Sequence, residues 1–186
     1  AIGQLYIIEG RKPRRVSPSG TRYRWFPWKI EREHLNVDTT TILHHNDASV
    51  SEVLHFHTAG TFVLVFGGLA RTWDFTNYWN LPLDDIPQLN TRWDDEAVLI
   101  EDTKTFGVAR IQFDFTPRSA LPYRDLGDFY AGHPSRHRGR LVAVEFTVNA
   151  GEEVRWSAAL GTEQNVIPVT AAEDAEVEWA SLWDAA

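Results

Sequence analysis

The fold is decided by residues 141–158, which read LVAVEFTVNAGEEVRWSA. Apolar side chains occupy every second position from Val142 to Val148, and again from Val154 to Ala158. An apolar repeat of two residues is typical of a strand with one face against a core. The turn residues Ala150 and Gly151 lie between the two runs. The sequence therefore predicts two strands that pair as a hairpin.

The same rhythm recurs along the 186 residues, and helical periodicity is nearly absent. Further strands are predicted at Leu5–Glu9, Thr21–Trp28, Thr40–His44, Val53–His57, Thr61–Phe66, Leu69–Phe75, Ala109–Phe115 and Glu176–Trp179. The aromatic-rich segments 76–95 and 116–140 break the rhythm and are predicted to be two long loops. About ten strands with few helices predict an all-β fold, a single jelly-roll barrel or sandwich over residues 1–186.

The net charge of the chain limits the classes of partner that are expected. Acidic residues outnumber basic ones by 26 to 18, so binding to nucleic acid through its phosphates is not expected. Cysteine is absent, which excludes disulfides and thiolate chemistry. No apolar run is long enough to span a membrane, and residues 1–15 lack the apolar core of a signal peptide.

The basic residues are unevenly distributed, because Lys12, Lys29 and Lys104 are the only lysines. Acid excess with scarce lysine fits a protein from a high-salt organism, whose carboxylates keep the surface hydrated. A GC-rich genome, which also replaces lysine by arginine, is the alternative explanation.

Histidines supply the first candidate site. His55 and His57 are two residues apart, so on a strand they share a face, as two metal ligands would. A third ligand would come from Glu52, His133 or His137. The segment from His55 to Gly68 resembles the first cupin motif, but Thr61 stands where that motif has a glutamate, and no second motif follows. A cupin-type metalloenzyme that uses His55 and His57 is therefore an alternative, and the main expectation is a protein with no metal or other cofactor.

A basic run supplies the second candidate site. Arg11, Lys12, Arg14 and Arg15 surround Pro13 in an otherwise acidic chain. Such a run can contact an acidic partner or an anionic lipid surface, and it can also be a solvated loop between two strands.

The eight tryptophans are a third feature. Exposed indoles serve a subunit interface, or they stack on sugars in a carbohydrate-binding β-sandwich, which is a second alternative. The common sequence motifs of catalysis are missing, and the carboxylate pairs Asp84-Asp85 and Asp94-Asp95 suit solvation or a cation better than acid–base chemistry.

In size, composition and strand layout the chain resembles the small major capsid protein of haloarchaeal icosahedral viruses with an internal membrane. That resemblance implies a structural subunit in the virion, a single upright jelly roll without enzymatic activity. It also implies packing against further copies and a second capsid protein, contact with the internal membrane, and no small-molecule substrate.

Overall fold

The structure is a computed structural model that describes residues 3–10, 12–16, 22–44, 49–67, 89–94, 96–102, 108–161, 176 and 179–181. Its elements, in chain order, are β1 (Gln4–Glu9), β2 (Lys12–Arg15), β3 (Arg22–Trp25), β4 (Lys29–Glu33), β5 (Val37–His44), β6 (Ser49–Phe56), β7 (Gly60–Gly67), β8 (Leu89–Asp94), β9 (Ala97–Asp102), β10 (Val108–Phe113), β11 (Ser119–Tyr123), α2 (Leu126–Ala131), β12 (Leu141–Val148) and β13 (Glu153–Gly161).

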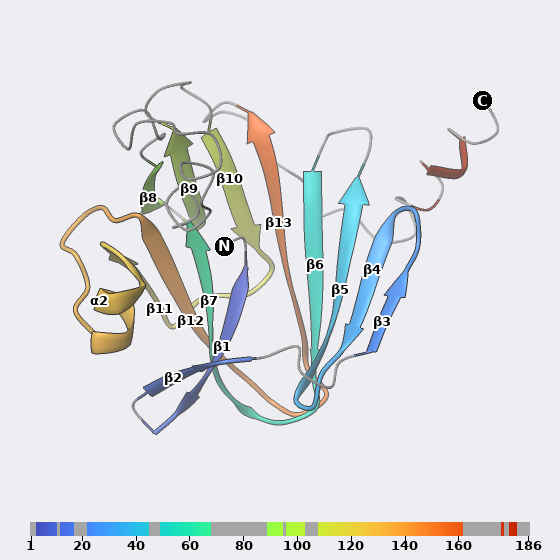
Figure 1. The fold of residues 1–186 in the computed structure, drawn as a ribbon, viewed down its shortest axis with the longest axis horizontal. Helices are drawn as coiled ribbons and strands as arrows, with labels where there is room; N and C mark the ends of the chain where they lie inside the picture. The colour runs from blue at the N-terminus through green and yellow to red at the C-terminus, as the bar shows by residue number, and fades with distance from the viewer. Residues whose placement is uncertain are drawn as a thin grey trace, which may run out of the picture.

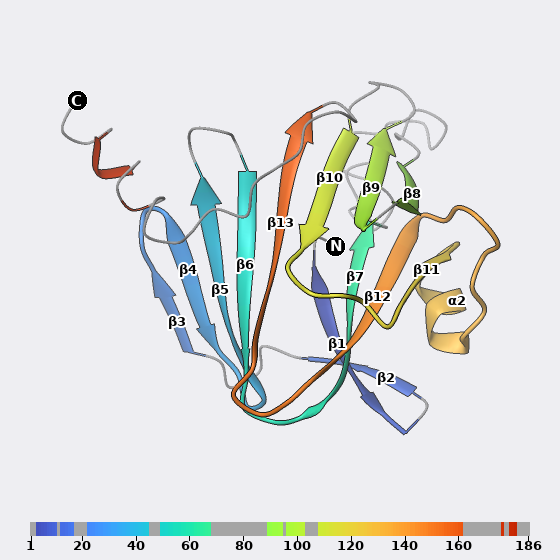
Figure 2. The same ribbon diagram turned by 180° about the vertical axis from the view of Figure 1, so that it is seen from behind.

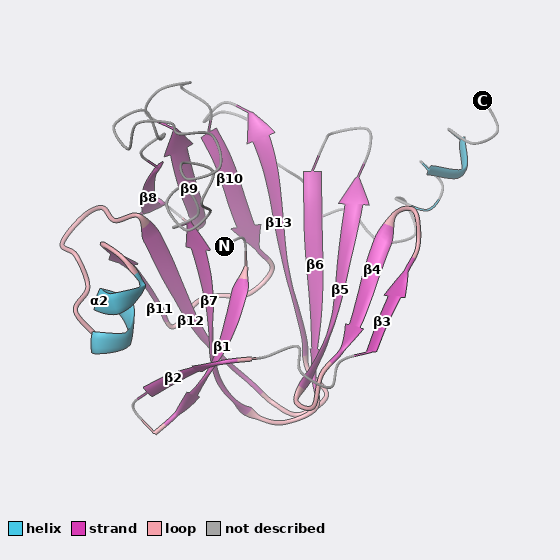
Figure 3. Cartoon of the chain, viewed as in Figure 1, coloured by secondary structure: helices cyan, strands magenta, loops and turns pink. Residues whose placement is uncertain are grey.

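The strands form two antiparallel sheets that face each other (Figure 1). A five-stranded sheet has the order β11-β12-β7-β1-β2, and an eight-stranded sheet has the order β3-β4-β5-β6-β13-β10-β9-β8. Figure 2 shows the same two layers from behind, and Figure 3 shows how little helix accompanies them. This confirms the predicted all-β, jelly-roll-like sandwich.

The core between the sheets combines aliphatic side chains with a cluster of aromatic rings. Phe56 and Phe62 lie with their ring centroids 4.5 Å apart, and Phe66 meets Trp156 edge to face at 5.3 Å. All four side chains are at most 2% exposed. Burying one phenylalanine contributes roughly 1.5–3 kcal/mol, so these rings contribute substantially to the attraction between the sheets.

The predicted hairpin at residues 141–158 is wrong. β12 belongs to the five-stranded sheet and β13 to the eight-stranded sheet, and the chain crosses between the sheets at residues 149–152. Two backbone hydrogen bonds hold the crossing. Gly151 N–H donates to the Phe56 carbonyl at 2.7 Å, and Phe56 N–H donates to the Glu152 carbonyl at 2.9 Å. Both strands keep their apolar residues inward, so Val148 and Val154 meet in the same core. Alternation of apolar residues indicates which side chains of a strand face the core, but it does not indicate which other strand pairs with it.

The two segments predicted as long loops contain regular structure. β8 lies inside 76–95, and β11 and α2 lie inside 116–140. Asp125 caps α2, since its carboxylate accepts from Asp128 N–H at 2.9 Å. Phe129 of α2 then packs on Tyr6 and Tyr123, on the outer face of the five-stranded sheet.

Other differences concern strand limits. β9 and β4 were not predicted, and the predicted strand Thr21–Trp28 ends at Trp25, where the chain turns. Residues 176 and 179–181 are helical, so the predicted strand at 176–179 is wrong. The predicted strand Leu69–Phe75 and residues 76–88 lie outside the described residues. No helix in the described part of the chain is long and apolar enough to cross a membrane.

The sandwich is closed on one side. Thr91 of β8 exchanges two backbone hydrogen bonds with Gly139, at 2.8 and 3.1 Å, and its hydroxyl donates to the Arg140 carbonyl at 3.0 Å. Arg140 leads directly into β12 of the other sheet. This bridge joins the two sheets at the β8 side, beside Gly67 at the end of β7.

We expect Gly67→Ala to destabilise the protein by about 3 kcal/mol or more. Gly67 has a φ of 95°, and a Cβ there would lie 2.7 Å from Thr91 Oγ1 and clash with the Arg140 carbonyl. Left-handed strain costs roughly 1–2 kcal/mol, and steric overlap adds roughly 1–3 kcal/mol. Gly151→Ala is the control, because its φ is 82° but nothing lies within 4 Å of an added Cβ. Urea unfolding of both variants measures the difference, and equal losses would contradict this packing.

Candidate interaction surface

Glu52 of β6 points into the space between the sheets and is only 8% exposed. Arg32 Nη1 lies 3.0 Å from its Oε1, and the Thr41 hydroxyl donates to the same oxygen at 3.0 Å. Trp156 Nε1 donates to Oε2 at 3.1 Å. The strand register places Thr41, Glu52 and Trp156 side by side on β5, β6 and β13, so the sheet itself assembles this network.

Burial raises the pKa of the Glu52 carboxyl, and Arg32, Thr41 and Trp156 oppose that rise. A buried carboxylate is tolerated only when it is paired and hydrogen-bonded, which is what the three donors provide. Arg32 also reaches Thr41 at 2.9 Å, so the guanidinium is fixed across β4, β5 and β6.

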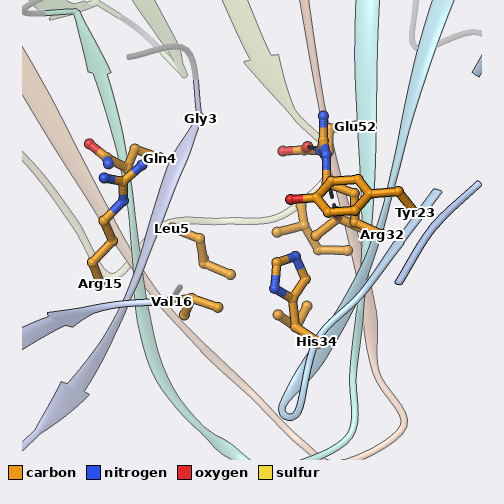
Figure 4. Close-up of a pocket in the computed structure, with 12 residues that line it drawn as sticks. Gly3, Gln4, Leu5, Arg15, Val16, Tyr23, Arg32, His34 and Glu52 are labelled. Carbon is orange, nitrogen blue, oxygen red and sulfur yellow. Dashed lines mark hydrogen bonds and ion pairs between the residues drawn. The ribbon is translucent and has the colours of Figure 1, made fainter. Parts of the chain in front are cut away.

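A pocket of about 190 Å³ lies beside this network (Figure 4). Leu5 and Val16 form an apolar wall on the side of β1 and β2, and Arg32, His34 and Glu52 line the opposite side. The pocket lies where the five-stranded sheet stops covering the eight-stranded one. It can hold a few water molecules or one small side chain.

Beyond the pocket, strands β3, β4 and β5 continue past the edge of the five-stranded sheet, and we call them the wing (Figure 1). Register places Trp25 and Ile30 in the same row as Glu52, and Leu43 in the row of the core residue Ala158, so all of them are on the inner face.

Tyr23, Trp25, Ile30 and Leu43 form what we call the wing face. Trp25 is 72% exposed, Tyr23 46% and Leu43 40%. An exposed apolar patch on a rigid sheet is typical of a surface that contacts another protein.

The C-terminal region reaches one corner of the wing. Trp179 Nε1 donates to the Leu43 carbonyl at 3.0 Å. The tryptophans thus have different roles: Trp156 is core, Trp25 is surface and Trp179 is a docking contact. Trp73, Trp79 and Trp183 lie outside the described residues.

The basic run is a strand, not a loop. Lys12, Arg14 and Arg15 are on β2, which pairs with β1, and Arg11 lies outside the described residues. Strand alternation puts Arg14 and Arg15 on opposite faces, so the run does not form one continuous patch.

Each of the two arginines has a neighbour on β1. Arg14 pairs with Glu9 at 2.6 Å, and this guanidinium lowers the pKa of the Glu9 carboxyl. With its oxygen turned toward β2, the Gln4 amide accepts from Arg15 Nη2 at 2.7 Å, and its nitrogen donates to the Tyr6 hydroxyl at 3.1 Å. A role for the run in partner or lipid contact stays a prediction.

His55 is on the outer face of β6, and His57 follows directly after the end of that strand, with the two ring centroids 5.6 Å apart. His57 Nε2 lies 3.1 Å from an Asp38 carboxylate oxygen. Glu52 as a third ligand is wrong, because it points to the opposite face and binds Arg32.

The other proposed ligands, His133 and His137, lie in the loop between α2 and β12. The backbone N–H of His133 donates to the Asp128 carbonyl at 2.9 Å. Thr61 belongs to β7. Within the described ranges, no three histidine or carboxylate side chains are grouped so that they could hold a metal ion.

Sequence reasoning missed Arg32 and Ile30 because β4 was not predicted. Its sequence, KIERE, alternates charge with a single apolar residue and carries no strong strand signal. The signal that could have revealed β4 is the row of threonines in β5. Thr39 and Thr41 accept hydrogen bonds from Arg32 of the neighbouring β4.

We expect Arg32→Met to destabilise the protein by about 3–5 kcal/mol at pH 7, since it leaves Glu52 as a buried, unpaired carboxylate. Burial already raises the pKa of Glu52, and losing Arg32 raises it further. The folded state then binds the proton more tightly than the unfolded state, so the variant regains stability as pH falls toward the ordinary glutamate pKa.

Adding Glu52→Gln to Arg32→Met removes the buried charge and should recover part of the loss at pH 7. Chemical denaturation of wild type, both single variants and the double variant, at neutral and acidic pH, measures the coupling. A loss in Arg32→Met that does not change with pH would show that the ion pair is not its cause.

No protein-family model and no curated protein sequence matches the chain. Among solved structures, it is similar to a protein assigned as a kojibiose phosphorylase from the human microbiome, with a TM-score of 0.45 and 9% identity over 97% of this chain. It is also similar to heparinase III, with a TM-score of 0.42 and 11% identity over 85% of this chain. The chain covers only 24% and 23% of those two proteins, respectively.

Proposed function

We propose that the chain is a structural subunit of an icosahedral viral capsid, and that it packs laterally against further copies and a companion capsid protein. The observation that carries the proposal is the wing face. In the part of the chain that the structure describes, the sandwich is closed at β8, and at β3 it presents a rigid, exposed apolar surface. A shell subunit needs that asymmetry, because its contacts with its neighbours must form in a defined direction.

The chemistry of the wing face suits assembly at high salt. At molar salt the screening length is about 3 Å, so long-range charge attraction does not hold subunits together. Apolar burial persists there, and Trp25, Tyr23 and Leu43 supply apolar surface. An acidic chain with a net charge of −8 stays soluble until such a face is covered.

The β1–β2 hairpin supports a second contact in the same proposal. It projects from the five-stranded sheet, away from the wing (Figure 1). Lys12, Arg14 and Arg15 are all exposed there, so this end of the molecule can meet an acidic partner or the anionic surface of an internal membrane.

We expect Trp25→Ser to shift the protein toward the 21.2 kDa monomer in molar NaCl, where the wild type self-associates, while its melting temperature changes little. The reason is that Trp25 is 72% exposed in the monomer and would be buried at a lateral contact. Light scattering across a range of NaCl concentrations measures the mass. Leu121→Ser is the control, because Leu121 is another exposed apolar residue, at 40%, but lies on β11. A wild type that is monomeric at every salt concentration, or equal behaviour of the two variants, would contradict the proposal.

We expect replacement of Lys12, Arg14 and Arg15 by serine to weaken binding to anionic vesicles roughly 100-fold at about 0.1 M salt, since each basic residue near such a surface contributes about 1 kcal/mol. The fold should survive, because these side chains are exposed. Co-sedimentation with anionic vesicles measures the effect, and vesicles of neutral lipid show the background. Arg118→Ser is the control, because Arg118 directly precedes β11, at the opposite edge of the five-stranded sheet from β2. Unchanged vesicle binding would remove the hairpin from the proposal.

A further inference from the structure

The two sheets have four edges, and three of them are protected against pairing with another strand. β2 carries Pro13 and β11 carries Pro122, each of which lacks an N–H to donate. β8 is bridged to Gly139. β3 has no proline, and all four of its residues are exposed. Among the sheet edges formed by the described residues, β3 is therefore the one that remains open to a further strand.

The ladder between β3 and β4 shows which groups are available. Phe26 N–H donates to the Lys29 carbonyl at 2.9 Å, so Phe26 and Lys29 form a hydrogen-bonded pair. Such pairs alternate along an antiparallel ladder, which makes Arg24 and Arg22 the next hydrogen-bonded residues of β3. The N–H and C=O groups of Tyr23 and Trp25 consequently point away from β4, toward the open edge.

The side chains along this edge define the partner. Arg22 and Arg24 are on the outer face, and Tyr23 and Trp25 are on the inner face. Arg24 is paired with Glu33 at 2.7 Å, whereas Arg22 makes no ion pair with any residue that the structure describes. A strand added here is favoured when it carries acidic residues on its outer face and apolar residues on its inner face.

A second copy of β3 does not meet this requirement. When two copies of β3 pair about a two-fold axis, the numbers of the two residues in each opposed pair have the same sum. Because side chains alternate between the two faces of a strand, that sum is even when the inner face of one copy continues the inner face of the other. Each register that opposes three residues of β3 to the other copy sets Arg22 opposite Arg24, or Arg24 opposite Arg24. Like charges directly opposite each other destabilise a ladder.

We propose that β3 binds an extended segment of a partner protein in which acidic and apolar residues alternate, and that this segment adds as a ninth, antiparallel strand to the eight-stranded sheet. Backbone groups of Tyr23 and Trp25 supply the hydrogen bonds, and Arg22 supplies the charge selectivity. The binding goes beyond the proposed shell assembly, because it requires only the isolated chain and the segment.

The probe is a labelled, end-capped peptide of about ten residues, the length of a long strand, with alternating Glu and Val. Binding to the full chain is measured by fluorescence anisotropy. We expect Tyr23→Pro to weaken it about fivefold to tenfold, the value of one lost backbone hydrogen bond. Tyr23→Val, which keeps the N–H, is the matched control for the lost ring. Because the Tyr23 N–H faces outward, the proline leaves the β3–β4 ladder intact, which thermal melting verifies.

The charge contribution is tested with Arg22→Gln, which should weaken binding a few-fold at about 0.1 M NaCl and have no effect at about 1 M, where screening is strong. The effect of Tyr23→Pro should persist at both salt concentrations. Two further peptides serve as controls. The first has the composition of the Glu-Val peptide, with all Glu residues in one half and all Val residues in the other. The second alternates Lys and Val.

Four results would overturn the inference: no binding of the Glu-Val peptide, equal binding by Tyr23→Pro and Tyr23→Val, equal binding of either control peptide, or a dimer of the chain that Tyr23→Pro abolishes and Tyr23→Val retains. Loss of a dimer in both Tyr23 variants reports on the wing face, because both remove the tyrosine ring. This inference and the shell proposal can therefore fail separately.

Discussion

The unequal width of the two sheets is the constraint on which the rest of the structure depends. Five strands cannot cover eight, so the aromatic core ends partway across the larger sheet. Where cover ends, the inner face changes from phenylalanine to the polar group of Arg32, Thr41 and Glu52, and beyond it to the exposed Trp25. The polar group lies where the carboxylate of Glu52 is still buried, and a buried charge must be paired and hydrogen-bonded. Farther from the core, Tyr23 and Trp25 are exposed.

The two edges of the eight-stranded sheet, β8 and β3, differ in how they relate to the five-stranded sheet. At β8 the sheets are tied by the Thr91–Gly139 bridge, which uses the N–H and C=O groups of Thr91. At β3, no further strand of the described residues continues the sheet, and Tyr23 and Trp25 are exposed.

Much of the fold could be predicted from the sequence, because burial imposes a period of two on every strand with a core face. That rule found β10 and the inward residues of β12 and β13, whereas β7 was found from its continuous apolar run. It failed for β4 and β8, where charged or polar residues interrupt the apolar pattern. It also failed at residues 141–158, since a hairpin and a crossing between sheets require the same alternation. The candidate site was harder, because Arg32 and Glu52 are twenty residues apart in the chain and meet only through the pairing of three strands.

By itself, the sequence determined the β-rich class, the inward and outward faces of most strands, the acidic surface and the absence of thiol chemistry. These properties follow from composition and from local periodicity. Only the tertiary structure decided that Arg14 and Arg15 are on opposite faces, that Glu52 turns away from His55, and that β3 is left open. The physical reason is that each depends on which strand lies beside which. Pairings such as β12 with β7 and β13 with β6 join segments that are far apart in the chain, so local periodicity does not reveal them.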